Sequence, residues 1–241
     1  MKSTPVHFRS KRRAYTLVEM LMAVGIMGLV SAVMVSFTKQ AMKLYYADTA
    51  RLKINHDIRA FTTQMDTDAV TANYFLIYPG FGSLTTGSGS TLADASVTDG
   101  GVGDLLVLVY TDPAQAATGT SMITELIGYY RQITDTTLNN GPVHRFDIPI
   151  SPSVAANSAP MYQIINTYVT GSASSPAYHI VTQLAQGLEN NAAQNATTPA
   201  LFYNRQNRSI IINAQVSELQ SEQGASTQVG NTYNFTVSPR G

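Results

Sequence analysis

The sequence contains no cysteine among its 241 residues. Disulfide bonds and thiolate metal sites are therefore excluded. Basic residues are scarce beyond residue 14: the first 14 residues carry five basic residues and no acid, and the remainder carries 10 basic and 15 acidic residues. Nucleic-acid binding requires a basic surface, so this balance argues against a nucleic-acid partner. The length is sufficient for a membrane segment and one domain with its own core.

One apolar run dominates the N-terminal part, from Leu17 to Phe37. A helix of this length would be roughly 30 Å long, enough to cross the hydrocarbon core of a bilayer. A single carboxylate, Glu19, lies inside the run, close to its start. Charge in a membrane is costly, so Glu19 is a candidate functional residue. The alternative is a glutamate near the interface whose side chain reaches the polar headgroups.

A short basic leader, residues 1–14, precedes the apolar run and ends with the charges of Lys11, Arg12 and Arg13. It is similar to the front region of an export signal. Positive charge on this side of the run predicts a single-pass protein with a cytoplasmic N-terminus. The Arg12-Arg13 pair also fits a twin-arginine export signal. Glu19 and the long helix predicted below count against that interpretation.

The helical pattern continues beyond the apolar run, because no proline or glycine occurs from Lys39 to Ala72. Apolar residues in this part recur at helical spacing: Ile54, Ile58, Phe61, Met65 and Ala69. Polar residues lie between them, among them Asp57, Gln64 and Asp68. The pattern predicts one continuous helix ending near residue 72, apolar all round in its first half and amphipathic in its second. The amphipathic half must bury its apolar stripe against the rest of the chain.

The remainder of the chain reads as a β-rich domain. Residues 78–82 are a turn signal, and residues 82–103 form a long polar loop. The sequence predicts strands at 105–110, 123–133, 143–150, 201–203, 209–216 and 232–237, with prolines ending the third. It predicts a short helix at 178–188 and leaves 164–169 open. Together these elements indicate an α+β fold in which the long helix packs on a mostly antiparallel sheet.

Catalytic and metal sites find little support. His7, His56, His144 and His179 are scattered, and none has a second histidine at metal spacing. Asp94, Asp99 and Asp104 could offer oxygen ligands to calcium, but their spacing misses the EF-hand pattern. A solvated acidic loop is the favoured interpretation. No nucleophile and base pair stands out, so no enzyme, metal or cofactor is expected.

Residues 14–19, with the sequence Ala-Tyr-Thr-Leu-Val-Glu, and the basic leader before them resemble the N-terminal signal of type IV pilin-like prepilins. The resemblance implies that prepilin peptidase cleaves between Ala14 and Tyr15, that Tyr15 is then N-methylated, and that the apolar helix is kept. It also implies that Glu19 is an assembly contact. The amine of Tyr15 in a neighbouring subunit would pair with Glu19 and offset its desolvation.

Departures from the common pattern point to a minor member of this family. Ala14 stands where glycine is usual, and Tyr15 stands where phenylalanine or methionine is usual. Ser36 occupies the place of a proline that major pilins often have in the span. The chain also lacks the C-terminal disulfide of many major pilins. The C-terminal segments resemble those of J-type or W-type minor pseudopilins.

The resemblance implies four parts: a cleaved leader (1–14), a transmembrane half-helix (15–38), an amphipathic half-helix (39–78) and a periplasmic β-rich domain (79–241). The expected protein is an inner-membrane subunit of a type II secretion pseudopilus or a type IV pilus-like filament. Its expected partners are prepilin peptidase, other pilins or pseudopilins, the inner-membrane assembly platform and membrane lipid. Two alternatives are a membrane-anchored periplasmic binding or adhesion module and an anchored enzyme.

Overall fold

The computed structural model describes residues 15–80, 84, 94–112, 120–132, 140–171, 182–190, 200–222 and 225–240. These residues divide between Ala47 and Asp48 into two units. The helices are α1 (Leu17–Thr71) and α2 (Met161–Gly171). The strands are β1 (Tyr74–Tyr78), β2 (Val102–Gly103), β3 (Leu105–Asp112), β4 (Met122–Arg131), β5 (Asn140–Ala155), β6 (Thr182–Asn190), β7 (Phe202–Arg205), β8 (Ser209–Glu222) and β9 (Ala225–Val237).

The first unit is the N-terminal part of α1. Every side chain from Tyr15 to Tyr46 is exposed, including all of the large apolar ones. Among the described residues, α1 is the one helix long and apolar enough to cross a membrane. A helix that is apolar on all sides needs lipid or other helices around it. The structure confirms the predicted continuous helix, which ends at Thr71.

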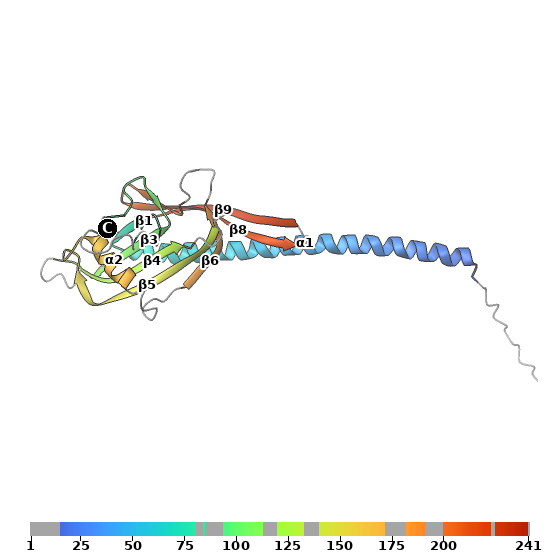
Figure 1. The fold of residues 1–241 in the computed structure, drawn as a ribbon, viewed down its shortest axis with the longest axis horizontal. Helices are drawn as coiled ribbons and strands as arrows, with labels where there is room; N and C mark the ends of the chain where they lie inside the picture. Colours follow the sequence, from blue (N-terminus) through green and yellow to red (C-terminus); the bar gives the residue numbers. More distant parts are fainter. Residues whose placement is uncertain are drawn as a thin grey trace, which may run out of the picture. The chain divides into compact units, whose positions relative to one another are not determined.

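The second unit contains a sheet in the order β1-β3-β4-β5-β6-β8-β7-β2, with β9 paired to β8. All of its strand pairs are antiparallel (Figure 1). The structure therefore confirms the α+β fold with a long N-terminal helix and an antiparallel sheet.

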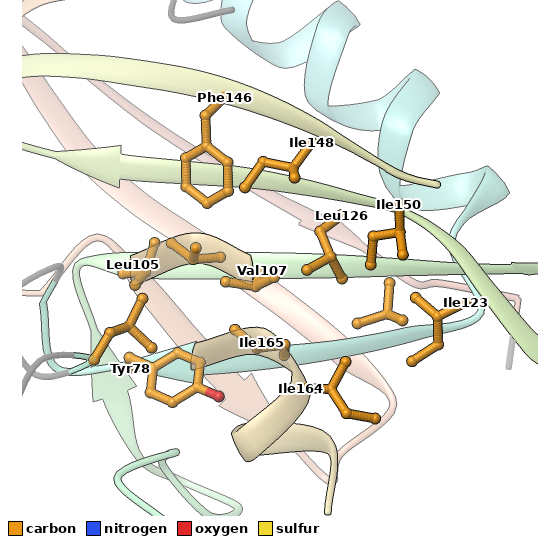
Figure 2. Close-up of a cluster of buried hydrophobic side chains, with 13 residues drawn as sticks. Tyr78, Leu105, Val107, Ile123, Leu126, Phe146, Ile148, Ile150, Ile164 and Ile165 are labelled. Atoms are coloured by element: carbon orange, nitrogen blue, oxygen red, sulfur yellow. The ribbon is translucent and has the colours of Figure 1, made fainter. Parts of the chain in front are cut away.

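One face of the sheet packs on α2. Its core is contributed by alternate residues of neighbouring strands, such as Val107 of β3 and Leu126 of β4. Ile164 and Ile165 of α2 join the same cluster, and Figure 2 shows these side chains pointing toward one another. Consecutive strand residues point to opposite faces of the sheet. The residues that alternate with this core therefore lie on the other face, and their burial requires another element to cover it.

That other element is the amphipathic part of α1. Its buried apolar residues include Ile54, Phe61, Met65 and Ala69, as the periodicity predicts, whereas Ile58 is only half-buried. The Phe61 ring lies 6.0 Å from that of Tyr129 on β4. Burying a large apolar side chain stabilises the fold by about 1.5–3 kcal/mol, so this stripe is the main attachment of α1 to the sheet.

Three local predictions need correction, and one segment that the sequence left open is now assigned. The helical part predicted for 39–78 is wrong at its end, because Tyr74–Tyr78 is strand β1. The helix predicted at 178–188 is wrong where the structure describes it, since Thr182–Asn190 is strand β6 and pairs with β5 and β8. Residues 178–181 lie outside the described residues. Pairing across the sheet overrides the local helical spacing in β6.

The third correction concerns β5, and the open segment lies in α2. Strand β5 continues past Pro149, which was expected to end it. Pro149 lies opposite Glu125, where the pairing with β4 shifts register, and such irregularities tolerate proline. The segment 164–169, which the sequence left open, belongs to helix α2.

Candidate assembly site and the helix–sheet junction

The first turn of α1 contains a reciprocal pair of hydrogen bonds. The main-chain N–H of Thr16 donates to Glu19 Oε2 over 2.9 Å, and the Thr16 hydroxyl donates to the same oxygen over 3.2 Å. The N–H of Glu19 donates to Thr16 Oγ1 over 3.3 Å. This arrangement is a capping box, which satisfies amide groups that the start of a helix otherwise leaves unpaired. Glu19 therefore has a local structural role that the sequence interpretation did not include.

The structure places two of the predicted site residues together at this helix start. Tyr15 is 80% exposed, and Glu19 is exposed on the first turn of α1. Lys11, Arg12, Arg13 and Ala14 lie outside the described residues. The exposed helix behind Glu19 carries Gly25 and Gly28, and no heavy atom lies within 4 Å of a Cβ placed on either glycine. Small residues of this kind permit close approach of another helix.

A buried carboxylate, Asp68, joins the amphipathic part of α1 to the sheet. Its Oδ2 accepts hydrogen bonds from Arg145 Nε on β5 over 2.7 Å and from the Tyr129 hydroxyl on β4 over 2.5 Å. Its Oδ1 accepts from Gln64 Nε2 over 3.1 Å, and its main-chain carbonyl accepts from the Tyr110 hydroxyl over 2.6 Å. Three neighbouring strands are therefore connected to one residue of the helix.

The carboxylates around Arg145 extend this polar group. Arg145 Nη1 lies 3.3 Å from Asp147 Oδ2, and Glu125 interacts with Asp147. Partial burial, followed by the hydrogen bond with Asp147 and the charge of that group, raises the pKa of Glu125 to about 7. Burial also raises the pKa of Tyr129, as does its hydrogen bond to Asp68. Tyr129 therefore remains a neutral donor to the Asp68 carboxylate.

The helical pattern predicts Asp68 on the polar side of α1, but the residue is only 6% exposed in the structure. A signal for its burial was present in the spacing. Phe61, Met65, Asp68 and Ala72 follow one another at four, three and four residues, which is also one helical face. A carboxylate on a buried face requires hydrogen-bonding partners, and these come from strands distant in sequence.

The three aspartates considered for calcium have structural partners instead. Asp94 Oδ1 accepts from the N–H of Ser96 over 2.9 Å, and Asp99 Oδ1 accepts from the N–H of Gln206 over 2.5 Å. Asp104 Oδ2 pairs with Arg131 Nη2 over 2.8 Å, and its Oδ1 accepts from the N–H of Leu201. Among the described residues, no three His, Cys, Asp or Glu side chains are grouped to hold a metal ion.

Two of the four histidines lie in the described part of the chain. His56 is exposed on α1 and lies 3.5 Å from Asp57. His144 stacks on Tyr130 with 5.2 Å between ring centroids, and burial lowers its pKa. Both positions agree with the expectation of solvated or packed histidines. His7 and His179 lie outside the described residues.

Comparison with protein families gives one match: the model described as prokaryotic N-terminal methylation motif, over residues 9–35. No curated protein and no solved structure was found to be significantly similar to the chain. The matched segment includes the basic residues Lys11–Arg13, the pair Ala14-Tyr15, Glu19 and the first part of α1. The match supports a protein of pilin or pseudopilin type, as the resemblance to prepilins implied.

Proposed function

We propose that this chain is a structural subunit that assembles through α1 into a type II secretion pseudopilus or a type IV pilus-like filament. The N-terminal methylation motif over residues 9–35 carries the proposal. It is supported by an exposed apolar helix that begins inside the motif and continues beyond it. The protein would anchor in the inner membrane with its N-terminus in the cytoplasm and the sheet domain in the periplasm.

In this proposal, prepilin peptidase cleaves between Ala14 and Tyr15, and Tyr15 becomes the N-methylated first residue. Lys11, Arg12 and Arg13 hold the leader on the cytoplasmic side. Residues 15–38 cross the membrane among lipids and other subunits, residues 39–71 continue the helix, and the sheet domain follows. The inner-membrane assembly platform would receive the mature subunit.

Glu19 is the proposed contact between subunits. Its described hydrogen bonds both fall on Oε2, so Oε1 is available to a donor from another chain. The capping box holds the carboxylate in the first turn of α1, beside the position where cleavage would create an amine on Tyr15. In the filament, the amine of a neighbouring subunit would pair with this preoriented carboxylate and offset its desolvation.

Processing is tested by expressing the full chain with an active prepilin peptidase and analysing the mature protein by mass spectrometry. The expected first residue is N-methylated Tyr15. The same chain expressed without the peptidase should keep its leader and serves as the control. A chain that still carries residues 1–14 in the presence of active peptidase would contradict the proposal.

The contact is tested by separating the charge of Glu19 from its capping role. Glu19→Gln keeps a capping side chain and removes the charge. The chain lacks native cysteine, so Ala23→Cys on the exposed helix supplies a unique thiol, which an oxidant can join by a disulfide to a cysteine introduced into the apolar helix of a partner pilin. Glu19→Gln should insert in the membrane but lose cross-links to partner pilins.

Asp48→Asn is the matched control, because Asp48 is an exposed carboxylate on the same helix. Combined with Ala23→Cys, it should cross-link as the Ala23→Cys chain with Glu19 and Asp48 intact does. If Glu19→Gln also cross-links normally, Glu19 is a helix cap without an assembly role. Residues 15–38 can also be replaced by an unrelated membrane span. If the protein still functions normally, these residues are only an anchor, and a membrane-anchored binding or adhesion module is favoured over a filament subunit.

A further inference from the structure

A pocket of about 840 Å³ lies at the edge of the sheet beside β1. One wall consists of four consecutive residues, 73–76, and another contains the consecutive residues 207–209. Because successive strand residues point to opposite faces, a pocket lined by consecutive residues follows the edge of a strand and its main chain. The pocket is therefore a site at a sheet edge and lies on neither face.

The outer edge of β1 offers main-chain groups to this pocket. The carbonyl of Ile77 accepts from the N–H of Val97 over 2.8 Å, and that of Pro79 accepts from the N–H of Asp104 over 3.1 Å. Main-chain groups of alternate residues point to the same side of a strand. The N–H and C=O of Phe75 therefore also point outward, and no described main-chain group pairs with them on that side.

The pocket continues as a slot between β1 and β7. Farther along this slot, an extended piece of the chain already lies between the two strands. Val97, which bonds to β1, accepts at its carbonyl from Asn204 Nδ2 on β7 over 3.1 Å. Asn204 exchanges main-chain bonds of 2.9 Å with Gly100 and Gly101. At Gly103 a Cβ would collide with the carbonyl of Tyr78. The slot thus admits a chain segment between two strands, and the pocket is its unfilled part.

The wall opposite β1 is a preformed turn between β7 and β8. Gln206 and Asn207 have positive φ angles of 57° and 51°, and their main-chain N–H groups donate to Asp99 Oδ1 and Asn204 Oδ1, respectively, which holds the turn in place. This geometry brings Arg208 to the pocket, where it is exposed and is the one charged side chain among the described lining residues. The turn therefore places a cation in the same pocket as the open edge of β1.

We propose that this pocket binds an extended peptide segment of another protein, which adds to the edge of β1 at Phe75 and places a carboxylate against Arg208. Strand addition of this kind derives affinity from main-chain hydrogen bonds and specificity from neighbouring pockets. The volume lies within the range of about 300–1,000 Å³ for ligand pockets and suits a short segment. This binding is independent of assembly through α1.

Two variants of the full chain in detergent micelles test the two contacts. Phe75→Pro removes the outward N–H without removing a donor to β3, since proline is tolerated where the N–H faces away from the sheet. Arg208→Gln removes the charge. Arg205→Gln is the matched control, because Arg205 is exposed at the end of β7, next to the same turn, but is not among the described residues that line the pocket. Circular dichroism should be unchanged in all three, and thermal unfolding should be unchanged in the two arginine variants.

The probe is a fluorescein-labelled peptide of alternating threonine and valine, about eight residues long, with one central glutamate, and binding is read by fluorescence anisotropy. Arg208→Gln and Phe75→Pro should each raise Kd about tenfold, the size expected for one charge-assisted or main-chain hydrogen bond. Arg205→Gln should leave Kd unchanged. Replacing glutamate by lysine in the peptide, or N-methylating its backbone, should abolish binding to the unmodified chain.

Three results would overturn the proposal. The first is the absence of saturable binding up to about 1 mM, a weak affinity for any specific complex. The second is equal binding of the N-methylated peptide, which would exclude strand addition. The third is that Arg208→Gln and Phe75→Pro both bind the peptide with the Kd of the unmodified chain, which would place the peptide elsewhere on the protein.

Discussion

Arg145 Nε on β5 lies 2.7 Å from Asp68 Oδ2 on α1, 77 residues earlier in the chain. Both side chains are largely removed from water, with exposures of 15% and 8%. Burial opposes the charged form of Arg145, but its hydrogen bond to Asp68 and the charge of that carboxylate raise its pKa. The pair fixes one rotational setting of the amphipathic part of α1 on the sheet, because only Asp68 on that face can accept these bonds.

Removing Asp68 should destabilise the sheet domain strongly. Asp68→Ala leaves Arg145 buried without its main partner and deprives the Tyr129 hydroxyl of its acceptor. Breaking a buried pair from one side costs about 3–5 kcal/mol, and this loss should appear in the free energy of unfolding measured with denaturant in micelles. In a double-mutant cycle with Arg145→Met, the combined loss should be smaller than the sum of the single losses.

The exposed pair Asp48 and Arg51 supplies the comparison. Their atoms are 3.7 Å apart, and the side chains are 72% and 68% exposed. Asp48→Ala should change the free energy of unfolding by less than about 1 kcal/mol. Equal losses in the free energy of unfolding for Asp48→Ala and Asp68→Ala would show that the buried Asp68–Arg145 pair stabilises the domain no more than an exposed ion pair does.

Glu125 should make the domain less stable as pH rises toward neutrality. Its pKa is about 7 in the folded protein, against an ordinary value of 4.5, because burial and Asp147 oppose its charge. Between these values the folded state holds a proton that the unfolded state has lost, so stability falls as pH increases. Glu125→Gln should remove this part of the pH dependence in melting temperatures recorded from pH 5 to pH 8.

Burial lowers the pKa of His144, so this residue also contributes to the pH dependence of stability. The informative quantity is therefore the difference in melting temperature between the unmodified chain and Glu125→Gln at each pH. Asp147 and Arg145 face Glu125 from β5, and Asp68 faces it from α1. A difference that does not vary with pH would exclude Glu125 as the titrating group.

Gly128→Ala should destabilise the sheet by steric overlap. A Cβ at Gly128 on β4 would collide with the ring of Phe146, its cross-strand neighbour on β5. Overpacking in a core costs about 1–3 kcal/mol, and thermal unfolding should show the loss. The double variant Gly128→Ala with Phe146→Leu should lose less stability than the sum of the losses of the two single variants.

Gly80→Ala is the control for that substitution, because nothing lies within 4 Å of a Cβ placed there. It should change the free energy of unfolding by no more than about 0.5 kcal/mol. A loss at Gly80 as large as that at Gly128 would indicate a backbone effect of glycine replacement and no specific clash with Phe146.

Thr16→Val should loosen the start of α1. It preserves the side-chain shape but removes the hydroxyl that accepts from the N–H of Glu19. Losing an N-cap costs about 1 kcal/mol, so amide hydrogen exchange in the first turn should accelerate about fivefold. Thr16→Ser keeps the hydroxyl and should exchange as the unmodified chain does. No difference between the two variants would argue against the capping box.

Much of the helical part could be predicted from sequence. The run from Leu17 to Phe37 and the stripe of Phe61, Met65 and Ala69 are local patterns, and α1 follows both. Strand β6 was mistaken for a helix because its apolar spacing fits both structures, and only pairing with β5 and β8 decides between them. The capping box was present as Thr16 and Glu19, three residues apart, and could have been recognised.

The sequence by itself determined the basic charge of residues 1–14, the apolar helix with Glu19 near its start and the motif over residues 9–35, because charge, hydropathy and short spacing are properties of neighbouring residues. Tertiary structure alone decided that Arg145 is a partner of Asp68 and that Arg208 lines the same pocket as residues 73–76 at β1. Both depend on which strands pair and in which register. Contacts between residues far apart in the chain set that register, and no single segment encodes it.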